Sequence, residues 1–204
     1  MHIVIEGQDA TGKDVQAAKL KDYFESQGKT VIAYSESGTN STDPFVQQIS
    51  NLNYKTDQNI DHTIRTLLFL INRYRQWQNL AVPALAKSHI VITTRSWLST
   101  LIYEGYAGGV SLDLIKDLHQ KIMPPSYFTP DKSIILTLDD AERERRISSQ
   151  HNRKTEIFKS ADSSIKNTIN HSYLTVARDF HIQTMDASGT VDQVFARLLE
   201  TLGF

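Results

Sequence analysis

The feature that most constrains this chain is a glycine-bounded turn, GQDATGK, at residues 7–13. A short β-branched run precedes it at residues 2–5, and a helical pattern follows it at residues 14–27. The spacing is that of a phosphate-binding loop, in which glycines let successive backbone N–H groups point at phosphate oxygens. A plain glycine-containing turn between strand and helix is the alternative. The flanking elements favour the phosphate loop, with Lys13 reaching the β- and γ-phosphates.

Strand-length apolar runs alternate with helical patterns along the whole chain. Isoleucine- and valine-rich runs of this kind are typical of strands buried on both faces. The strand candidates are residues 2–5, 30–34, 90–93, 133–138 and 182–185. The helix candidates are residues 14–27, 60–87, 111–122, 141–149, 162–180 and 190–202. This alternation predicts a single α/β domain over residues 1–204 with the three-layer P-loop NTPase fold, in which helices flank a five-stranded parallel sheet.

Composition excludes several classes of protein. The chain has 22 basic and 23 acidic residues, so its net charge of −1 does not direct it to nucleic acid or to an anionic membrane. It contains no cysteine, which excludes disulfides and thiolate metal sites. No signal peptide is recognisable at the N-terminus, and no apolar run approaches the roughly 20 residues that cross a bilayer. We therefore expect a cytoplasmic protein with neither a nucleic-acid nor a membrane partner.

The residue after Lys13 departs from the phosphate-loop pattern. A P-loop normally supplies serine or threonine there as a Mg²⁺ ligand, and this chain has Asp14. A carboxylate oxygen is also a suitable Mg²⁺ ligand, but it brings negative charge close to the phosphates. Asp14 is therefore expected either to contact the metal or to weaken nucleotide binding.

Blocks of sequence along the chain resemble, in order and spacing, the thymidylate kinase family of nucleoside-monophosphate kinases. They are EGQDATGKD at 6–14, LLFLINR at 67–73, VITTR at 91–95 followed by STLIYEG at 99–105, PDKSIILTL at 130–138 and DASG at 186–189. The resemblance implies transfer of the ATP γ-phosphoryl group to dTMP, with Mg²⁺ as cofactor and a homodimer as the assembly. It also implies a mobile lid, at about residues 146–158, which includes the polar stretch 150–155.

The resemblance assigns one set of residues to ATP. The phosphates are expected to contact the loop and the start of its helix, namely Gly7, Gln8, Asp9, Ala10, Thr11, Gly12, Lys13 and Asp14. Ala187 and Ser188 would border the adenine. Because the loop itself carries no arginine, Arg146 and Arg153 of the lid are the candidate catalytic cations. The alternative is that these arginines belong to a solvated, charge-rich face.

A second set is assigned to the acceptor nucleotide. Phe69 would stack on the thymine and Arg73 would bind the dTMP phosphate, which suits a guanidinium fork. Arg95 would bridge the donor and acceptor phosphates, Asp9 would lie near the sugar and the metal, and Tyr103 near the deoxyribose. Glu36 and Glu104 complete the predicted acceptor site. Taken singly, Phe69 and Tyr103 are also typical core residues, and the two arginines are also typical of solvated positions.

Three departures from the family pattern bear on function. Thr94 stands where the family has an aspartate tied to the metal. The family has a hydroxyl at position 14 and a carboxylate at position 94, whereas this chain has a carboxylate at 14 and a hydroxyl at 94. Ser35 replaces an arginine, and Glu104 replaces the usual glutamine. We hypothesise that the acidic ligand has moved across the Mg²⁺. The alternatives are a kinase for another deoxynucleotide or a deoxynucleoside, or a nucleotide-binding homologue with impaired catalysis.

Overall fold

The computed structural model describes residues 1–54, 60–149 and 163–204, without the side chains of residues 149 and 163. The expected loop at 150–155, and with it most of the expected lid, lies outside the described residues. In the described ranges, no helix combines the length and the apolar character that crossing a membrane requires.

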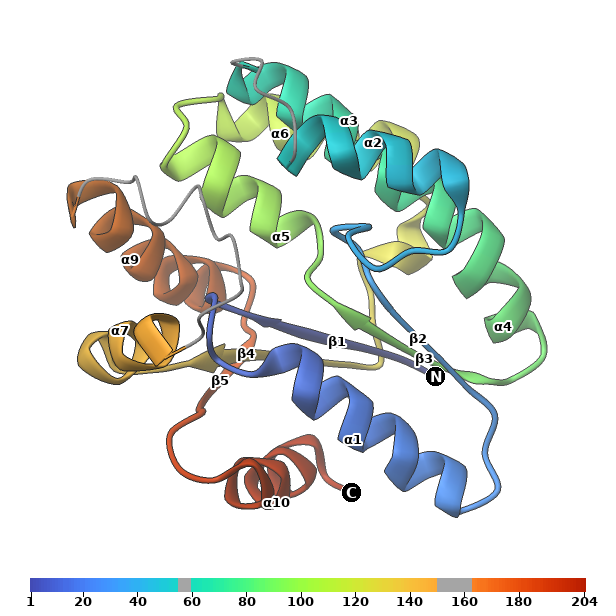
Figure 1. Cartoon of the computed structure of the whole chain (residues 1–204). Helices are drawn as coiled ribbons and strands as arrows, with labels where there is room; N and C mark the ends of the chain where they lie inside the picture. Colours follow the sequence, from blue (N-terminus) through green and yellow to red (C-terminus); the bar gives the residue numbers. More distant parts are fainter. Residues whose placement is uncertain (55–59, 150–162) are drawn as a thin grey trace.

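The centre of the molecule is one parallel sheet (Figure 1). Its strands are β1 (His2–Gly7), β2 (Val31–Ser35), β3 (Ile90–Thr94), β4 (Lys132–Thr137) and β5 (Gln183–Asp186). They lie in the order β2-β3-β1-β4-β5, and each neighbouring pair is parallel. The sequence-based prediction of a five-stranded parallel sheet is confirmed.

Helices cover both faces of the sheet. They are α1 (Lys13–Ser26), α2 (Pro44–Tyr54), α3 (His62–Gln76), α4 (Val82–Ala86), α5 (Trp97–Thr100), α6 (Leu112–Ile122), α7 (Asp140–Ser149), α9 (Ser163–Asp179) and α10 (Val191–Leu202). Two π-helical segments, η1 (Trp77–Ala81) and η2 (Leu101–Tyr106), and a short 3-10 turn, η3 (Pro125–Tyr127), join some of them. Figure 1 shows α1 and α10 on one side of the sheet and α3, α5 and α6 on the other.

Successive strand residues point into different layers. Ile134 packs with α1 and α10, whereas its neighbour Ile135 packs into the core under α5, α6 and α9. In β3, Ile92 packs on the side of α1 and α10, and Val91 packs on the side of α5, α6 and α9. All four side chains are fully buried, which explains why these strands are continuously apolar in sequence.

Two helical regions were not predicted. The buried face of α2 carries Val46, Ser50 and Asn53, while its larger side chains, such as Phe45, are exposed, so the helix has no apolar stripe. All four residues of α5 are buried, which leaves no contrast between two faces. Helical periodicity depends on that contrast, so neither helix was recognisable from pattern.

The long helix predicted over residues 60–87 is interrupted by a change of hydrogen bonding. The N–H of Val82 donates to the carbonyl of Trp77, five residues back, which makes η1 a π-helical turn between α3 and α4. Pro83 follows immediately and has no N–H to continue the α-helical ladder. The chain nevertheless runs on in one direction, so α3, η1 and α4 cover the sheet as one unit (Figure 1).

Candidate functional site

The loop between β1 and α1 is built for close approach to a ligand. Gly7 lies against β4 so closely that a Cβ on it would be 2.6 Å from the carbonyl oxygen of Leu136. Gly12 has a φ of +83°, and Lys13, which follows it, is the first residue of α1. Thr11 Oγ1 donates to the carbonyl of Gln8 at 2.8 Å and closes the loop. The helix N-terminus therefore points its free N–H groups into a tight turn, which suits an anion.

Three charged side chains meet beside this loop. Lys13 Nζ lies 3.7 Å from Asp9 Oδ1, and an Arg95 Nη2 hydrogen bond reaches the same oxygen from the end of β3. Although burial raises it, Arg95 and Lys13 together lower the pKa of Asp9 below its usual value. Burial and the Arg95 charge lower the pKa of Lys13, against the opposing effect of Asp9. Two cations thus share one carboxylate at the mouth of the loop.

The backbone at Arg95 is unusual. Its φ of +67° lies in the left-handed region, which a non-glycine residue adopts at a cost of roughly 1 kcal/mol or more. The guanidinium also lies over the Tyr103 ring, 5.3 Å from the ring centroid. Arg95 is therefore held in a specific position by both its backbone and its contacts.

Glu6 is a site residue that sequence reasoning missed. Its carboxylate is buried and accepts hydrogen bonds from the Ser96 backbone N–H at 2.5 Å and from Ser99 Oγ at 2.9 Å. Ser96 Oγ donates to it as well, at 2.8 Å. Glu6 thereby fixes the turn that follows Arg95. An acidic residue inside an otherwise apolar strand was the signal in the sequence.

The two residues that depart from the expected metal site are in direct contact. Thr94, at the end of β3, donates from Oγ1 to Asp14 Oδ1 at 2.8 Å. Asp14 is exposed at the start of α1, whereas Thr94 is buried. The tertiary structure therefore brings together positions that are 80 residues apart in sequence.

This pair fits a phosphate-bound Mg²⁺. In the described part of the chain, no three His, Asp or Glu side chains form a ready-made metal cage. Mg²⁺ does not need one, because it commonly uses one or two protein carboxylates and takes its other oxygens from water and phosphate. The Asp14 carboxylate and the Thr94 hydroxyl supply hard oxygen donors beside the loop. They are the residues that would hold the metal.

Arg73 lies in a buried polar cluster. Its Nε donates to Glu36 Oε2 at 2.9 Å, its Nη1 to Thr100 Oγ1 at 2.6 Å and its Nη2 to the carbonyl of Ser96 at 2.7 Å. Tyr127, which the sequence did not single out, also donates to Glu36 Oε2, at 2.7 Å. Burial raises the pKa of Glu36 to about 7, although Arg73 and Tyr127 oppose the shift. Each guanidinium nitrogen of Arg73 is thus already engaged by the protein.

Phe69 lies beside this cluster and is buried. The Arg73 guanidinium is 5.7 Å from the centroid of its ring, and the ring of Tyr54 meets it edge-on at a centroid distance of 5.8 Å. Tyr54 ends α2, the helix missed from sequence, so its place in the site was missed too.

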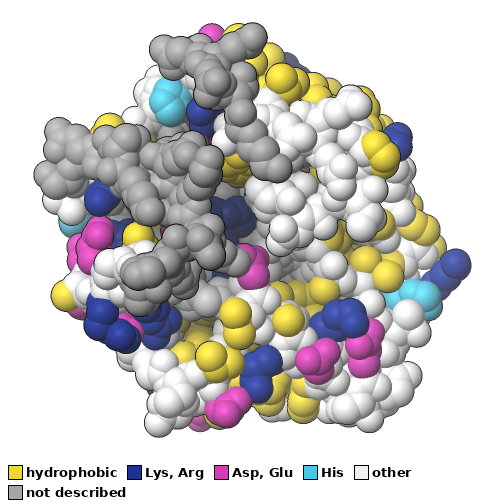
Figure 2. Space-filling model, viewed as in Figure 1, with side chains coloured by type: hydrophobic (Ala, Val, Ile, Leu, Met, Phe, Trp, Pro, Cys, Tyr) yellow, Lys and Arg dark blue, Asp and Glu magenta, His cyan; other side chains and the backbone are white. Residues whose placement is uncertain are grey.

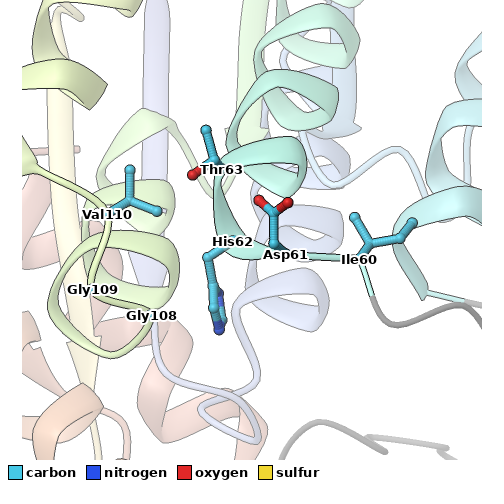
Figure 3. Close-up of a pocket in the computed structure, with 7 residues that line it drawn as sticks. All are labelled: Ile60, Asp61, His62, Thr63, Gly108, Gly109 and Val110. Atoms are coloured by element: carbon cyan, nitrogen blue, oxygen red, sulfur yellow. The ribbon is translucent and has the colours of Figure 1, made fainter.

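Glu104, one of the expected acceptor-site residues, contacts a histidine at the start of α3. Its buried carboxylate pairs with His62 Nδ1 at 2.5 Å. Figure 3 shows His62 with Asp61 and Thr63 at the start of α3, facing Gly108 and Gly109 across a shallow pocket. His62 packs so closely that a Cβ on Gly108 would be 2.4 Å from its Nδ1. The hydrogen bond to Glu104 raises the pKa of His62 above its usual value. Sequence reasoning had given His62 no role.

On the other side of the loop, Arg146 links α7 to two turns. Its Nη1 donates to the carbonyl of Ala10 at 3.4 Å and its Nη2 to that of Ala187 at 3.0 Å. Ser188 follows Ala187 in the β5–α10 turn, and its backbone N–H donates to Asp186 Oδ1 at 3.0 Å. Arg153 lies outside the described residues. Figure 2, which has the same view as Figure 1, shows basic and acidic side chains gathered at a hollow near the centre of the molecular face that it displays.

Comparison with known proteins shows which family this chain resembles. The family model described as thymidylate kinase matches residues 5–198. A thymidylate kinase of Desulfotalea psychrophila is 33% identical over 178 residues, covering 84% of this chain and 83% of the relative. One from Mycoplasma capricolum is 26% identical, covering 99% and 94%. One from a Wolbachia species of Brugia malayi is 35% identical, but the match covers 68% of this chain and only 65% of that relative.

A solved structure supports the fold. The crystal structure of thymidylate kinase from Ehrlichia chaffeensis superposes with a TM-score of 0.73 at 22% identity, covering 99% of this chain and 98% of that one. The family model spans nearly the whole chain, and it includes the phosphate loop, Arg95 and the β5–α10 turn. The chain therefore belongs to the thymidylate kinase family.

Proposed function

We propose that this protein transfers the γ-phosphoryl group of ATP to dTMP and releases dTDP and ADP. The observation that carries the proposal is the meeting of Lys13 and Arg95 on the Asp9 carboxylate. One cation belongs to the phosphate loop and the other to the neighbouring strand end. A pair of cations at the boundary between a donor and an acceptor site is what phosphoryl transfer demands of a protein, because the reaction depends on positioning and charge neutralisation.

The chain's own residues divide the work. The loop from Gly7 to Gly12 would bind the ATP phosphates through backbone N–H groups, and Lys13 would neutralise the β- and γ-oxygens. Arg95 would contact both donor and acceptor phosphates. When phosphates arrive, they compete with Asp9 for these cations, so Asp9 keeps the site's charges balanced before binding. Mg²⁺, held at Asp14 and Thr94, would supply further neutralisation of the phosphates.

The acceptor site is proposed on the far side of Arg95. Phe69 offers a ring for the thymine, with the Arg73 guanidinium over that ring and Tyr103 beneath Arg95. Glu36 orients Arg73 through a hydrogen bond, and Glu104 pairs with His62 at the edge of the proposed acceptor site. On the donor side, Ala187 and Ser188 would border the adenine, and Arg146 would tie this turn to the loop. Arg153 remains a proposed lid cation. Residues 1–204 are proposed to form one kinase domain.

We also propose that the protein is a homodimer. Four large apolar side chains, Ile64, Leu67, Ile71 and Tyr74, line one face of α3 and are each more than 40% exposed. Their spacing follows helical periodicity, so they form a continuous stripe that a second copy could cover. Light scattering should show a dimer for the wild type and a monomer for Leu67→Glu. Val191→Glu, at an equally exposed site on α10, should remain dimeric.

An assay of ADP release tests the reaction. The protein would be incubated with ATP, Mg²⁺ or Mn²⁺, and each of a panel of nucleoside monophosphates and deoxynucleosides. We expect dTMP to give the highest kcat/KM, and Lys13→Ala to lower it roughly 10²-fold or more because its charge acts on the transferring phosphates. Lys19→Ala, at a partly exposed position on α1 where the lysine pairs with Asp192, is the matched control. A different preferred acceptor would replace dTMP, and no turnover with any acceptor would reject the kinase proposal.

A further inference from the structure

The side chain of Gln8, inside the phosphate loop, is anchored to another part of the fold. It is almost fully buried, and its Nε2 donates to Asn170 Oδ1 at 2.8 Å. Asn170 lies on α9, 162 residues further along the chain. No motif in the sequence pointed to it. The loop is therefore held from outside as well as by its own Thr11–Gln8 hydrogen bond.

The amide of Asn170 uses both of its ends. Its Oδ1 also accepts from Arg143 Nη1 on α7, and its Nδ2 donates to Asp140 Oδ1 at 2.5 Å. Arg143 in turn pairs with Asp140 at 3.2 Å. Because two donors face the oxygen and a carboxylate faces the nitrogen, the reversed amide would place N–H against N–H. The orientation of Asn170 is thus determined by its neighbours, and it presents an acceptor to Gln8.

The network connects the loop to two helices at once. Figure 1 shows α7 and α9 side by side near the carboxyl end of β1. Arg143 is 2% exposed, and it is one of the cations that lower the pKa of Asp9 in the loop. Within the described residues, Gln8 Oε1 and Arg143 Nε are buried and have no hydrogen-bond partner. Buried polar atoms in this state are costly, so the network is retained at some expense of stability.

We propose that Asn170 is a positioning residue for the phosphate loop. By holding Gln8 against α7 and α9, it fixes the loop backbone in the conformation that presents its N–H groups to the phosphates of ATP. The proposal rests on the proposed function only in taking ATP as the ligand of this loop. It follows that loss of the Asn170 amide weakens ATP binding far more than dTMP binding, because Phe69 and Arg73, the main proposed dTMP contacts, do not touch the network within the described residues.

The test is calorimetric binding of Mg·ATP and, separately, of dTMP to the full-length protein. Asn170→Leu replaces the amide with an apolar group of the same branched shape and number of heavy atoms, and we expect the Kd for ATP to rise about tenfold, as for a lost buried hydrogen bond. The Kd for dTMP should stay within about twofold. Asn167→Leu makes the same change at an exposed site on the same helix and should leave both values unchanged. Thermal unfolding of each variant reports whether it is folded.

Gln8→Leu tests the same hydrogen bond from the loop, and it carries the test if Asn170→Leu does not fold. The Gln8→Leu/Asn170→Leu double variant should bind ATP no more weakly than the weaker single variant, because both changes remove one shared contact. Unchanged ATP binding in Asn170→Leu, equal loss of ATP and dTMP, or additive losses in the double variant would overturn the inference. A wild type that fails to bind ATP would reject the proposed function and the inference with it. If the wild type binds ATP, the variants test the inference separately from the proposed function.

Discussion

Thr94 Oγ1 donates a 2.8 Å hydrogen bond to Asp14 Oδ1, joining the end of β3 to the first turn of α1. The resemblance to the family had suggested that these two positions exchange a hydroxyl and a carboxylate. Their contact gives that hypothesis a physical basis, since both side chains can face one Mg²⁺. It also means that each residue's properties depend on the other, so they should be varied together.

A double-mutant cycle tests the exchange. Asp14→Ser should lower Mg²⁺-dependent turnover by removing a ligand, and Thr94→Asp should lower it by placing two carboxylates side by side. The double variant should recover most of the turnover, because residues in contact are not additive. Mn²⁺ binding, measured by water-proton relaxation in the presence of ATP, should follow the same pattern. Additive losses in either measurement would reject the exchange.

Replacing Arg73 should affect both ligand binding and stability. Arg73→Ala is expected to weaken dTMP far more than ATP, by about 1.5–3 kcal/mol for a lost charged hydrogen bond. It also leaves Glu36 buried without its cation, so unfolding free energy should fall by about 3–5 kcal/mol. Adding Glu36→Gln should restore part of the stability and none of the dTMP affinity. Calorimetry and denaturant unfolding separate these effects, and equal losses of dTMP and ATP would contradict the acceptor-site role.

The pair Arg145 and Arg146 offers a matched comparison on α7. Both contact Glu142, but only Arg146 is also bonded to the carbonyls of Ala10 and Ala187. Arg146→Ala should therefore raise the KM for ATP about tenfold, in line with the loss of charged hydrogen bonds. Arg145→Ala, which removes an exposed ion pair, should leave the KM within about twofold. Similar effects of the two changes would place Arg146 on a solvated face.

The His62–Glu104 pair should make stability depend on pH. Glu104 raises the pKa of His62, helped by Asp61 and opposed by burial and by Arg65, so the folded state favours the imidazolium. The stabilisation is therefore fully present below the unfolded pKa of about 6.5 and is lost as pH rises through the raised folded value. The Tm difference between wild type and His62→Gln should be largest near about pH 6 and shrink by about pH 9. Glu104→Gln should abolish this dependence, and a constant difference would show that the pair makes no ionic contribution.

Local sequence determined much of this protein. Two glycines and Lys13 at fixed offsets specified the phosphate loop, because backbone curvature and a helix N-terminus are local properties. Continuous apolar runs such as the one in β1 specified buried parallel strands, since burial on both faces leaves no polar positions. Arg95 and Phe69 were found because they sit in recognisable blocks next to such elements.

The partners of these residues were decided by the tertiary structure alone. The sequence around Asp9 does not indicate that Arg95 binds its carboxylate. The sequence around Gln8 likewise does not indicate that Asn170 on α9 accepts a hydrogen bond from the Gln8 side chain. The family resemblance placed Glu104 in the acceptor site, but nothing in the sequence indicated that it pairs with His62. These contacts join residues 42 to 162 positions apart. Asp9 and Arg95 meet because parallel strands connected by helices bring the carboxyl ends of β1 and β3 to one edge of the sheet, whereas the other two pairs depend on how the helices pack. The chemistry of each side chain follows from the sequence, but its partner is determined by the order of the strands and by how the helices pack on them.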